Sequence, residues 1–296
     1  MRQLDTELRR FFARRLVRGI VLVTLLIAIL SISIATVRGH PPRANGARVS
    51  VGQPVIIDQN GTPVTDLNGR QEFVYPQDLQ QPDTRIDVGK SLRDTLQGMA
   101  VVMLFLCVVL GASFVGADFN VGSLTSQLLY EPRRWRVHLA KAATVAIACA
   151  AVAAFVCVFI GALMYGGSEL HGIVRGITAD WWRHRAVDLA RAVVVAASAG
   201  VMSYSVTMVL HRTSAAIVAF MVQFPLVHIH KSVPVVGLIA RCLPFRGLIA
   251  ITSDPSTGTN LDLGIRTNAG GLAFVALWIV LLFVFSGLVF SRSEVR

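Results

Sequence analysis

Long apolar runs alternate with short polar or basic segments along this chain of 296 residues. Three runs, residues 99–117, 192–210 and 270–290, contain no charged residue at all. Two further runs, 19–37 and 142–165, have similar length and are also free of charge. A hydrocarbon layer about 30 Å thick needs about 20 apolar residues per helix. We therefore predict that each of these five runs is a membrane-spanning helix.

A sixth span is predicted over residues 214–227, which is shorter and contains Gln223 and Pro225. Proline removes one helical hydrogen bond, so we expect a kink there. Backbone groups cannot remain unpaired in lipid, and the runs do not alternate as barrel strands would. The predicted fold class is an all-α polytopic membrane protein with six transmembrane helices. Small residues such as Ala196 and Gly200 should let a neighbouring helix approach closely.

The distribution of Lys and Arg predicts the topology. If the N-terminus is cytoplasmic, the inside segments are 1–18, 118–141, 211–213 and the tail 291–296. These segments hold 13 basic residues in 51 positions, whereas the outside segments 38–98, 166–191 and 228–269 hold 15 in 129. Cytoplasmic loops are enriched in basic residues. We therefore expect both termini to be cytoplasmic.

Three segments outside the spans have their own predicted structure. Residues 4–18 suit a helix lying in the membrane interface, with Leu4, Leu8, Phe11 and Phe12 facing lipid and the arginines meeting anionic headgroups. The loop 38–98 contains three Asn-Gly pairs, which favour tight turns between strands and predict a small extracytoplasmic β ribbon. The apolar stretch 233–252 is broken by Pro and Gly and predicts re-entrant half-helices, with a seventh span as the alternative.

The net charge of +11 does not indicate nucleic-acid binding, because the basic residues mostly flank the apolar runs. The four cysteines have no metal-ligand spacing. The stretch 88–91 (VGKS) ends like a phosphate loop, but Thr84 stands where that motif requires glycine. No catalytic, metal or cofactor site is therefore predicted on this chain.

Polar side chains within the spans could line a translocation path. The candidates are Ser203, Tyr204, Ser205, Thr207 and Gln223. Hydrogen bonds between helices are the alternative explanation. Carboxylates at membrane depth, which proton-coupled carriers use, are absent from the predicted spans, so energy should come from another chain. Asp188 and Arg191 lie near the outer edge of a span, and we expect them to form a solvated ion pair.

The link 116–142 between the second and third spans carries the most information. Asp118 or Asn120 can cap a short helix, and Val121, Leu124 and Leu128 then form an apolar stripe along it. Glu131-Pro132 should end this helix, since the residue before proline avoids helical geometry. The basic residues Arg133, Arg134 and Arg136 then mark the membrane edge.

This link resembles that of the ABC-2 type permeases, the membrane subunits of bacterial type V ABC exporters. The matching features are Asp118, Gly122-Ser123, the helix 124–130, Pro132-Arg133 and Lys141. Many members carry Glu at the position of Asp118. The six-span plan and the broken helices before the last span are also similar to that family.

The resemblance implies a bacterial plasma-membrane permease, without enzymatic activity, that pairs with a second permease chain as a homodimer or heterodimer. Each chain would sit on a separate ABC ATPase subunit, which holds the ATP and Mg. Helix 121–130 would be the coupling helix, and the turn at His211 and Arg212 a second contact. The residues expected at this ATPase contact are Asp118, Val121, Gly122, Ser123, Leu124, Leu128, Glu131, Arg133, Arg134, His211 and Arg212.

Two other classes of function remain open on the sequence. One is a self-sufficient channel or secondary carrier. The other is a membrane scaffold that does not transport, with the loop 38–98 as its binding module. The transported substrate is not indicated by any motif.

Overall fold

The structure is a computed structural model that describes residues 2–38, 87–122, 133–171, 174, 177–229, 234–253, 265 and 267–292. Nearly all of these residues lie in helices. In chain order the helices are α1 (Arg2–Ala13), α2 (Arg15–Arg38), α3 (Val88–Val121), α5 (Arg134–His171), α6 (Ala179–Leu210), α7 (Thr213–Ile229), α8 (Pro234–Cys242), α9 (Pro244–Thr252) and α11 (Asn268–Arg292).

Five helices in the described part of the chain are long and apolar enough to cross a membrane: α2, α3, α5, α6 and α11. They contain the five runs from which the sequence predicted spans. The sixth predicted span corresponds to α7, which has 17 residues and contains Pro225. At 1.5 Å per residue, α7 is about 25 Å long, less than the thickness of a typical hydrocarbon layer. The all-α membrane fold is therefore supported, and the sixth crossing stays a prediction.

Several helices extend well beyond the predicted spans. α3 begins at Val88, within the segment predicted as the loop 38–98, and α6 begins at Ala179, within the predicted loop 166–191. Polar caps set these starts: the Asp87 carboxylate accepts a hydrogen bond from the Gly89 amide at 2.9 Å, and Thr178 accepts one from the Trp181 amide at 3.2 Å. Hydropathy locates the membrane-embedded part of a helix, whereas caps decide where the helix begins.

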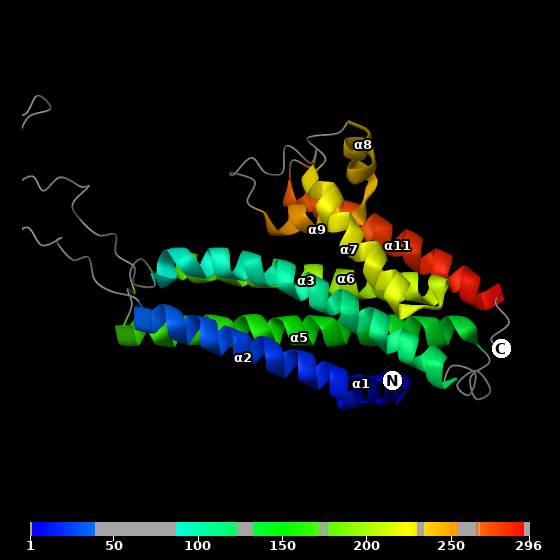
Figure 1. Ribbon diagram of the computed structural model, residues 1–296, viewed down its shortest axis with the longest axis horizontal. Coiled ribbons are helices and arrows are strands. Elements are labelled where there is room, and N and C mark those ends of the chain that lie inside the picture. Colours follow the sequence, from blue (N-terminus) through cyan, green and yellow to red (C-terminus); the bar gives the residue numbers. More distant parts are fainter. Residues whose placement is uncertain are drawn as a thin grey trace, which may run out of the picture.

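The helices form two adjoining groups (Figure 1). α3 and α6 lie side by side over most of their length, with α5 and α2 along one side of them and α7, α9 and α11 on the other. α1 and the C-terminal end of α11 lie at the same end of this bundle. We call this the N-terminal end; the first turn of α3 and the start of α6 lie at the opposite end.

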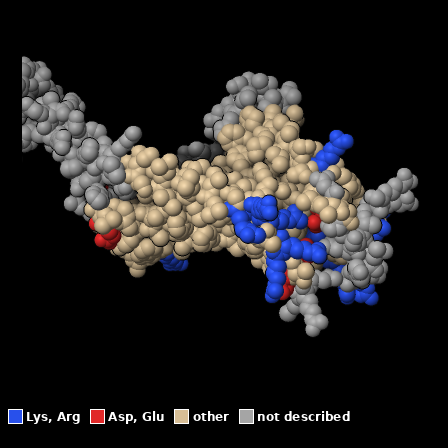
Figure 2. Space-filling view, turned by 60° about the horizontal axis from the view of Figure 1, so that its bottom comes forward, with Lys and Arg blue, Asp and Glu red and all other residues tan. Residues whose placement is uncertain are grey.

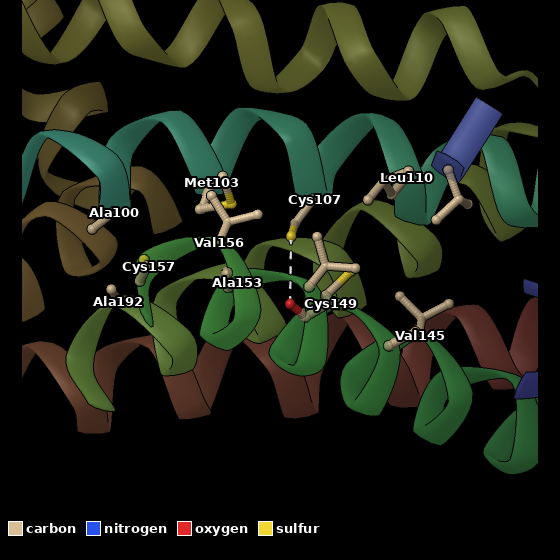
Figure 3. Close-up of a cluster of buried hydrophobic side chains, with 14 of the residues drawn as sticks. Ala100, Met103, Cys107, Leu110, Val145, Cys149, Ala153, Val156, Cys157 and Ala192 are labelled. Carbon is tan, nitrogen blue, oxygen red and sulfur yellow. Dashed lines mark hydrogen bonds between the residues drawn. The ribbon is translucent and has the colours of Figure 1, made fainter. Parts of the chain in front are cut away.

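Small residues allow the central helices to pack closely, as the sequence predicted for Gly200. A Cβ on Gly200 of α6 would lie 2.6 Å from the Cys149 sulfur of α5, and a Cβ on Gly111 of α3 would collide with the Gly200 carbonyl. Figure 3 shows the apolar side chains around this junction, where the Cys107 thiol lies 3.9 Å from the Cys149 carbonyl oxygen. Three helices thus meet at positions where any side chain would force them apart.

The N-terminal helix α1 is docked on the bundle, so the prediction that Phe11 faces lipid is wrong. Phe11 is fully buried, with its ring centroid 5.3 Å from that of Phe114 in α3. Leu8 also packs against the core, Leu4 is half-buried, and Phe12 is exposed. An amphipathic helix can bury its apolar face against protein as well as against lipid, and the sequence pattern is the same in both cases.

The stretch 233–252 forms two short helices, α8 and α9, that begin at Pro234 and Pro244. Neither is long enough to span, and α9 packs against α11, with Gly247 close to the Gly271 carbonyl. The break into half-helices agrees with the sequence, while their re-entrant placement stays a prediction. The predicted β ribbon lies in residues 39–86, outside the described residues.

Candidate functional site

A buried ionic cluster joins three helices at the N-terminal end of the bundle. Lys141 of α5 is 1% exposed, and its ammonium nitrogen lies 2.5 Å from Oδ2 of Asp118 in α3. The same nitrogen lies 3.5 Å from Oε2 of Glu7 in α1. One cation is thus shared between carboxylates from two other helices.

Arg14, in the junction between α1 and α2, completes this cluster. Its guanidinium lies 3.0 Å from Oδ1 of Asp118 and donates hydrogen bonds to the Phe114 and Ser113 carbonyls of α3 at 2.9 and 3.1 Å. It also lies 4.6 Å from the centroid of the Phe114 ring. Arg10 of α1 also lies 3.5 Å from Oε1 of Glu7, so three cations surround the two carboxylates.

The cluster fixes geometry more than it adds stability. When two opposite charges are buried together, their attraction roughly offsets the solvation free energy that they lose. Removing one partner leaves the other charge buried alone and lowers stability by about 3–5 kcal/mol. The sequence placed Asp118 among the residues that touch a partner protein. In the structure its carboxylate is turned into the bundle and bound to Lys141 and Arg14, so Asp118 positions helices of its own chain.

Other predicted contact residues come together on the surface beside this cluster. Val121, the last residue of α3, is 80% exposed, and Gly122 ends the helix with φ of 68°. His211 ends α6 with φ of 55°, and its ring centroid lies 4.8 Å from that of Phe119. Two contacts predicted from segments about 90 residues apart therefore form one surface, which also includes the exposed Arg212.

The remaining members of the predicted contact set divide into two groups. Ser123, Leu124, Leu128 and Glu131 lie in residues 123–132, outside the described residues. Arg133 is exposed. Arg134 instead donates to the Phe290 carbonyl at 3.0 Å, which ties the start of α5 to the C-terminal end of α11.

The hydroxyl groups proposed for a path are buried and make hydrogen bonds inside the protein. Ser203 donates to the Val108 carbonyl of α3 at 2.7 Å, while Thr207 and Ser205 donate to carbonyls of their own helix. The Ser203 bond is of the helix-to-helix kind that the alternative describes, whereas the Thr207 and Ser205 bonds stay within α6. Gln223 donates to the Ala219 carbonyl of its own helix at 3.0 Å, and its buried side-chain oxygen has no hydrogen-bond partner among the described residues.

The fourth hydroxyl, that of Tyr204, belongs to a polar contact that the sequence did not predict. It lies 2.9 Å from Nδ1 of His138 in α5, whose Nε2 lies 3.2 Å from the Phe283 carbonyl of α11. A neutral imidazole protonated on Nε2 satisfies both contacts, because Nδ1 then accepts the tyrosine proton. His138 thereby links α5, α6 and α11. Neither its spacing nor its neighbours in the sequence distinguish it from a histidine at the membrane edge.

The ion pair of Asp188 differs from the prediction of a solvated pair. The Asp188 side chain is only 12% exposed and lies between Arg191, at 3.4 Å, and Arg185, at 3.1 Å. Arg185, three residues before Asp188, was not predicted as its second partner. These three residues lie on α6 in the half of the bundle opposite the N-terminal end.

Basic side chains gather at the N-terminal end of the molecule, as Figure 2 shows. The exposed basic residues of the segments that meet there are Arg9, Arg10, Arg15, Arg18, Arg133, Arg136, Arg212 and Arg292. Across the described residues, no group of three or more His, Cys, Asp or Glu side chains could hold a metal ion.

These features define a helical protein with several helices suited to crossing a membrane. No family model, no curated protein and no solved structure matches the chain.

Proposed function

We propose that this chain is the permease subunit of a bacterial ABC transporter, an exporter driven by a separate ATP-binding subunit that docks at the N-terminal end. In this proposal the chain crosses the plasma membrane six times with both termini in the cytoplasm. It forms the substrate path with a second permease chain, and ATP and Mg are bound by the ATPase. The observation that carries the proposal is the adjacency of the α3 end and the His211–Arg212 turn.

The proposed orientation of the chain in the membrane rests on its basic residues. The N-terminal end carries the exposed arginines described above, and basic residues favour the cytoplasmic side. The link 123–132 joins two helices at this end, so the segment that resembles a coupling helix would face the compartment that contains ATP.

The buried cluster explains how a docked partner could move the membrane helices. The link 123–132 is covalently joined to α3 and α5, and the Asp118–Lys141 pair holds these two helices together at its base. A push on the link would therefore move α3 and α5 as a unit instead of spreading them. Arg14 would carry the displacement to α1 and α2.

Co-purification tests the proposal. The tagged chain, co-expressed with the ATPase encoded beside it, should retain that ATPase in mild detergent. Replacing Leu124 and Leu128 by Asp should abolish retention and stimulated ATP hydrolysis, because charge would remove the apolar stripe. Leu170→Asp provides a matched control, since Leu170 is 77% exposed at the far end of α5.

The outcome separates the classes of function. If no ATPase accompanies the wild-type chain, or if the double variant retains it as well as wild type, the permease proposal fails. ATP-independent flux through liposomes containing the chain alone would instead favour a self-sufficient channel or carrier.

A further inference from the structure

An apolar groove of about 520 Å³ opens between α3, α5 and α6 in the half of the bundle opposite the N-terminal end. Its walls include Leu92 and Leu96 of α3, Val158 and Gly161 of α5, and Leu189 of α6. The residues of α5 that line the groove include Val158 and Gly166, which are eight residues apart, or roughly 12 Å along the helix at 1.5 Å per residue. The groove is therefore elongated along the helices, in the direction that an acyl chain takes in a bilayer.

Aromatic side chains mark one end of this groove. Trp182, which is 53% exposed, and Tyr165 both line it, with ring centroids 6.3 Å apart. The neighbouring Trp181 donates its indole N–H to the Gly89 carbonyl at 3.1 Å and so fixes α6 to the first turn of α3. Trp and Tyr favour the depth of lipid headgroups, which places this end at the membrane surface.

A single cation, Arg185, lines the groove near these rings. Its side chain is 14% exposed, and its guanidinium carbon lies 5.8 Å from the centroid of the Trp181 ring. The buried Nε–H has no hydrogen-bond partner among the described residues. Nη1 lies 3.1 Å from the Asp188 carboxylate, in a geometry that makes no hydrogen bond.

The local charges do not balance. Asp188 lies between Arg185 and Arg191, so the three described side chains carry one positive charge in excess. The acidic residue of α5 is Glu169, which is exposed near the end of that helix. An excess positive charge that is largely removed from water is costly unless an anion lies close to it.

We propose that this groove binds one anionic phospholipid of the surrounding leaflet. One acyl chain lies along α5 against Val158 and Gly161, and the phosphate lies at the end of the groove beside the positively charged Arg185 side chain. The net negative headgroup neutralises the excess charge of the Arg185–Asp188–Arg191 cluster. This lipid site lies away from the proposed ATPase surface and does not depend on it.

Native mass spectrometry on the full chain tests the site. The protein is reconstituted in nanodiscs of phosphatidylcholine with phosphatidylglycerol as the minor lipid and then released into detergent. Wild type should retain one phosphatidylglycerol molecule in preference to phosphatidylcholine. Loss of the positive charge beside the phosphate, as in Arg185→Gln, should lower that preference by roughly tenfold.

Two controls keep the test decisive. Arg183, two residues before Arg185, has an exposed side chain. Arg183→Gln removes the same charge there and should leave the preference for phosphatidylglycerol unchanged. Gly161→Leu leaves the charges intact and fills the groove, since a Cβ at Gly161 meets only Leu92 at 3.9 Å; it should displace the lipid. Gly98→Leu, at an exposed position with open space around it, should retain the lipid.

Four results would overturn the proposal. The first is equal retention of both lipids by wild type, and the second is an equal loss in Arg183→Gln. The third is full retention in Gly161→Leu, which would place the lipid elsewhere. A retained mass corresponding to a fatty acid instead of a phospholipid would also contradict it.

Discussion

Asp118 and Lys141 join the end of α3 to the start of α5 through a buried ion pair whose charged atoms lie 2.5 Å apart. These two residues bracket the link between the second and third predicted spans. One ionic contact therefore joins the two helices that flank residues 123–132, with Arg14 bound to the same carboxylate. This contact ties the C-terminal part of α3 to the N-terminal part of α5.

The first prediction concerns that pair. Asp118→Asn leaves the Lys141 charge buried without its main partner and should lower the free energy of unfolding by about 3–5 kcal/mol. Thermal unfolding of the purified chain in detergent measures the loss. Asp5→Asn is the control, because the Asp5–Arg9 pair has side chains that are 65% and 81% exposed and should contribute little.

A double variant distinguishes lost pairing from lost packing. Asp118→Leu combined with Lys141→Met removes both charges and should recover much of the stability lost in the single variant, because no uncompensated charge stays buried. If Asp118→Asn melts at the wild-type temperature, the cluster does not hold these helices together.

The second prediction concerns the close approach at Gly200. Gly200→Ala places a methyl group 2.6 Å from the Cys149 sulfur and should destabilise the chain by about 1–3 kcal/mol through overpacking. Thermal unfolding is again the measurement. Adding Cys149→Ala should restore part of the loss, because it removes the sulfur that collides.

Gly98→Ala is the matched control, since nothing lies within 4 Å of a Cβ at that position. It should be neutral or slightly stabilising, because alanine favours helix more than glycine does. Equal destabilisation by both substitutions would argue against a specific three-helix junction.

The third prediction concerns the contact of His138 with Tyr204. Tyr204→Phe removes the hydroxyl that donates to Nδ1 of His138 and leaves this buried nitrogen without a donor, at a cost of about 1–3 kcal/mol. Ser205→Ala removes a hydroxyl that binds only the Val201 carbonyl of its own helix and should cost less. Identical melting temperatures for wild type and Tyr204→Phe would show that this contact is dispensable.

The fourth prediction rests on the proposed function. Arg212→Glu and Val121→Asp alter exposed positions on the two parts of the proposed docking surface. Each should weaken binding of the ATPase subunit by about tenfold, or about 1.4 kcal/mol. Surface-immobilised permease titrated with the ATPase measures this affinity, and helical content by circular dichroism should be unchanged. Unaltered binding in both variants would remove this surface from the interface.

The sequence by itself determined the class of fold, because five apolar runs of sufficient length can satisfy their backbone in lipid only as helices. It also predicted the break into α8 and α9, since prolines stand at both starts, and the close approach at Gly200. These features depend on residues near one another in the chain or on a single small side chain.

Only the tertiary structure decided which polar residues meet. Asp118 could have faced a partner, Phe11 could have faced lipid, and Asp188 could have been solvated. The hydropathy pattern of the sequence is the same whether these side chains are exposed or buried. Packing resolves these alternatives, because a buried charge must find opposite charge on another helix, and that helix can come from any part of the chain. For the same reason the cluster of Glu7, Arg14, Asp118 and Lys141 is visible only once α1, α3 and α5 lie side by side.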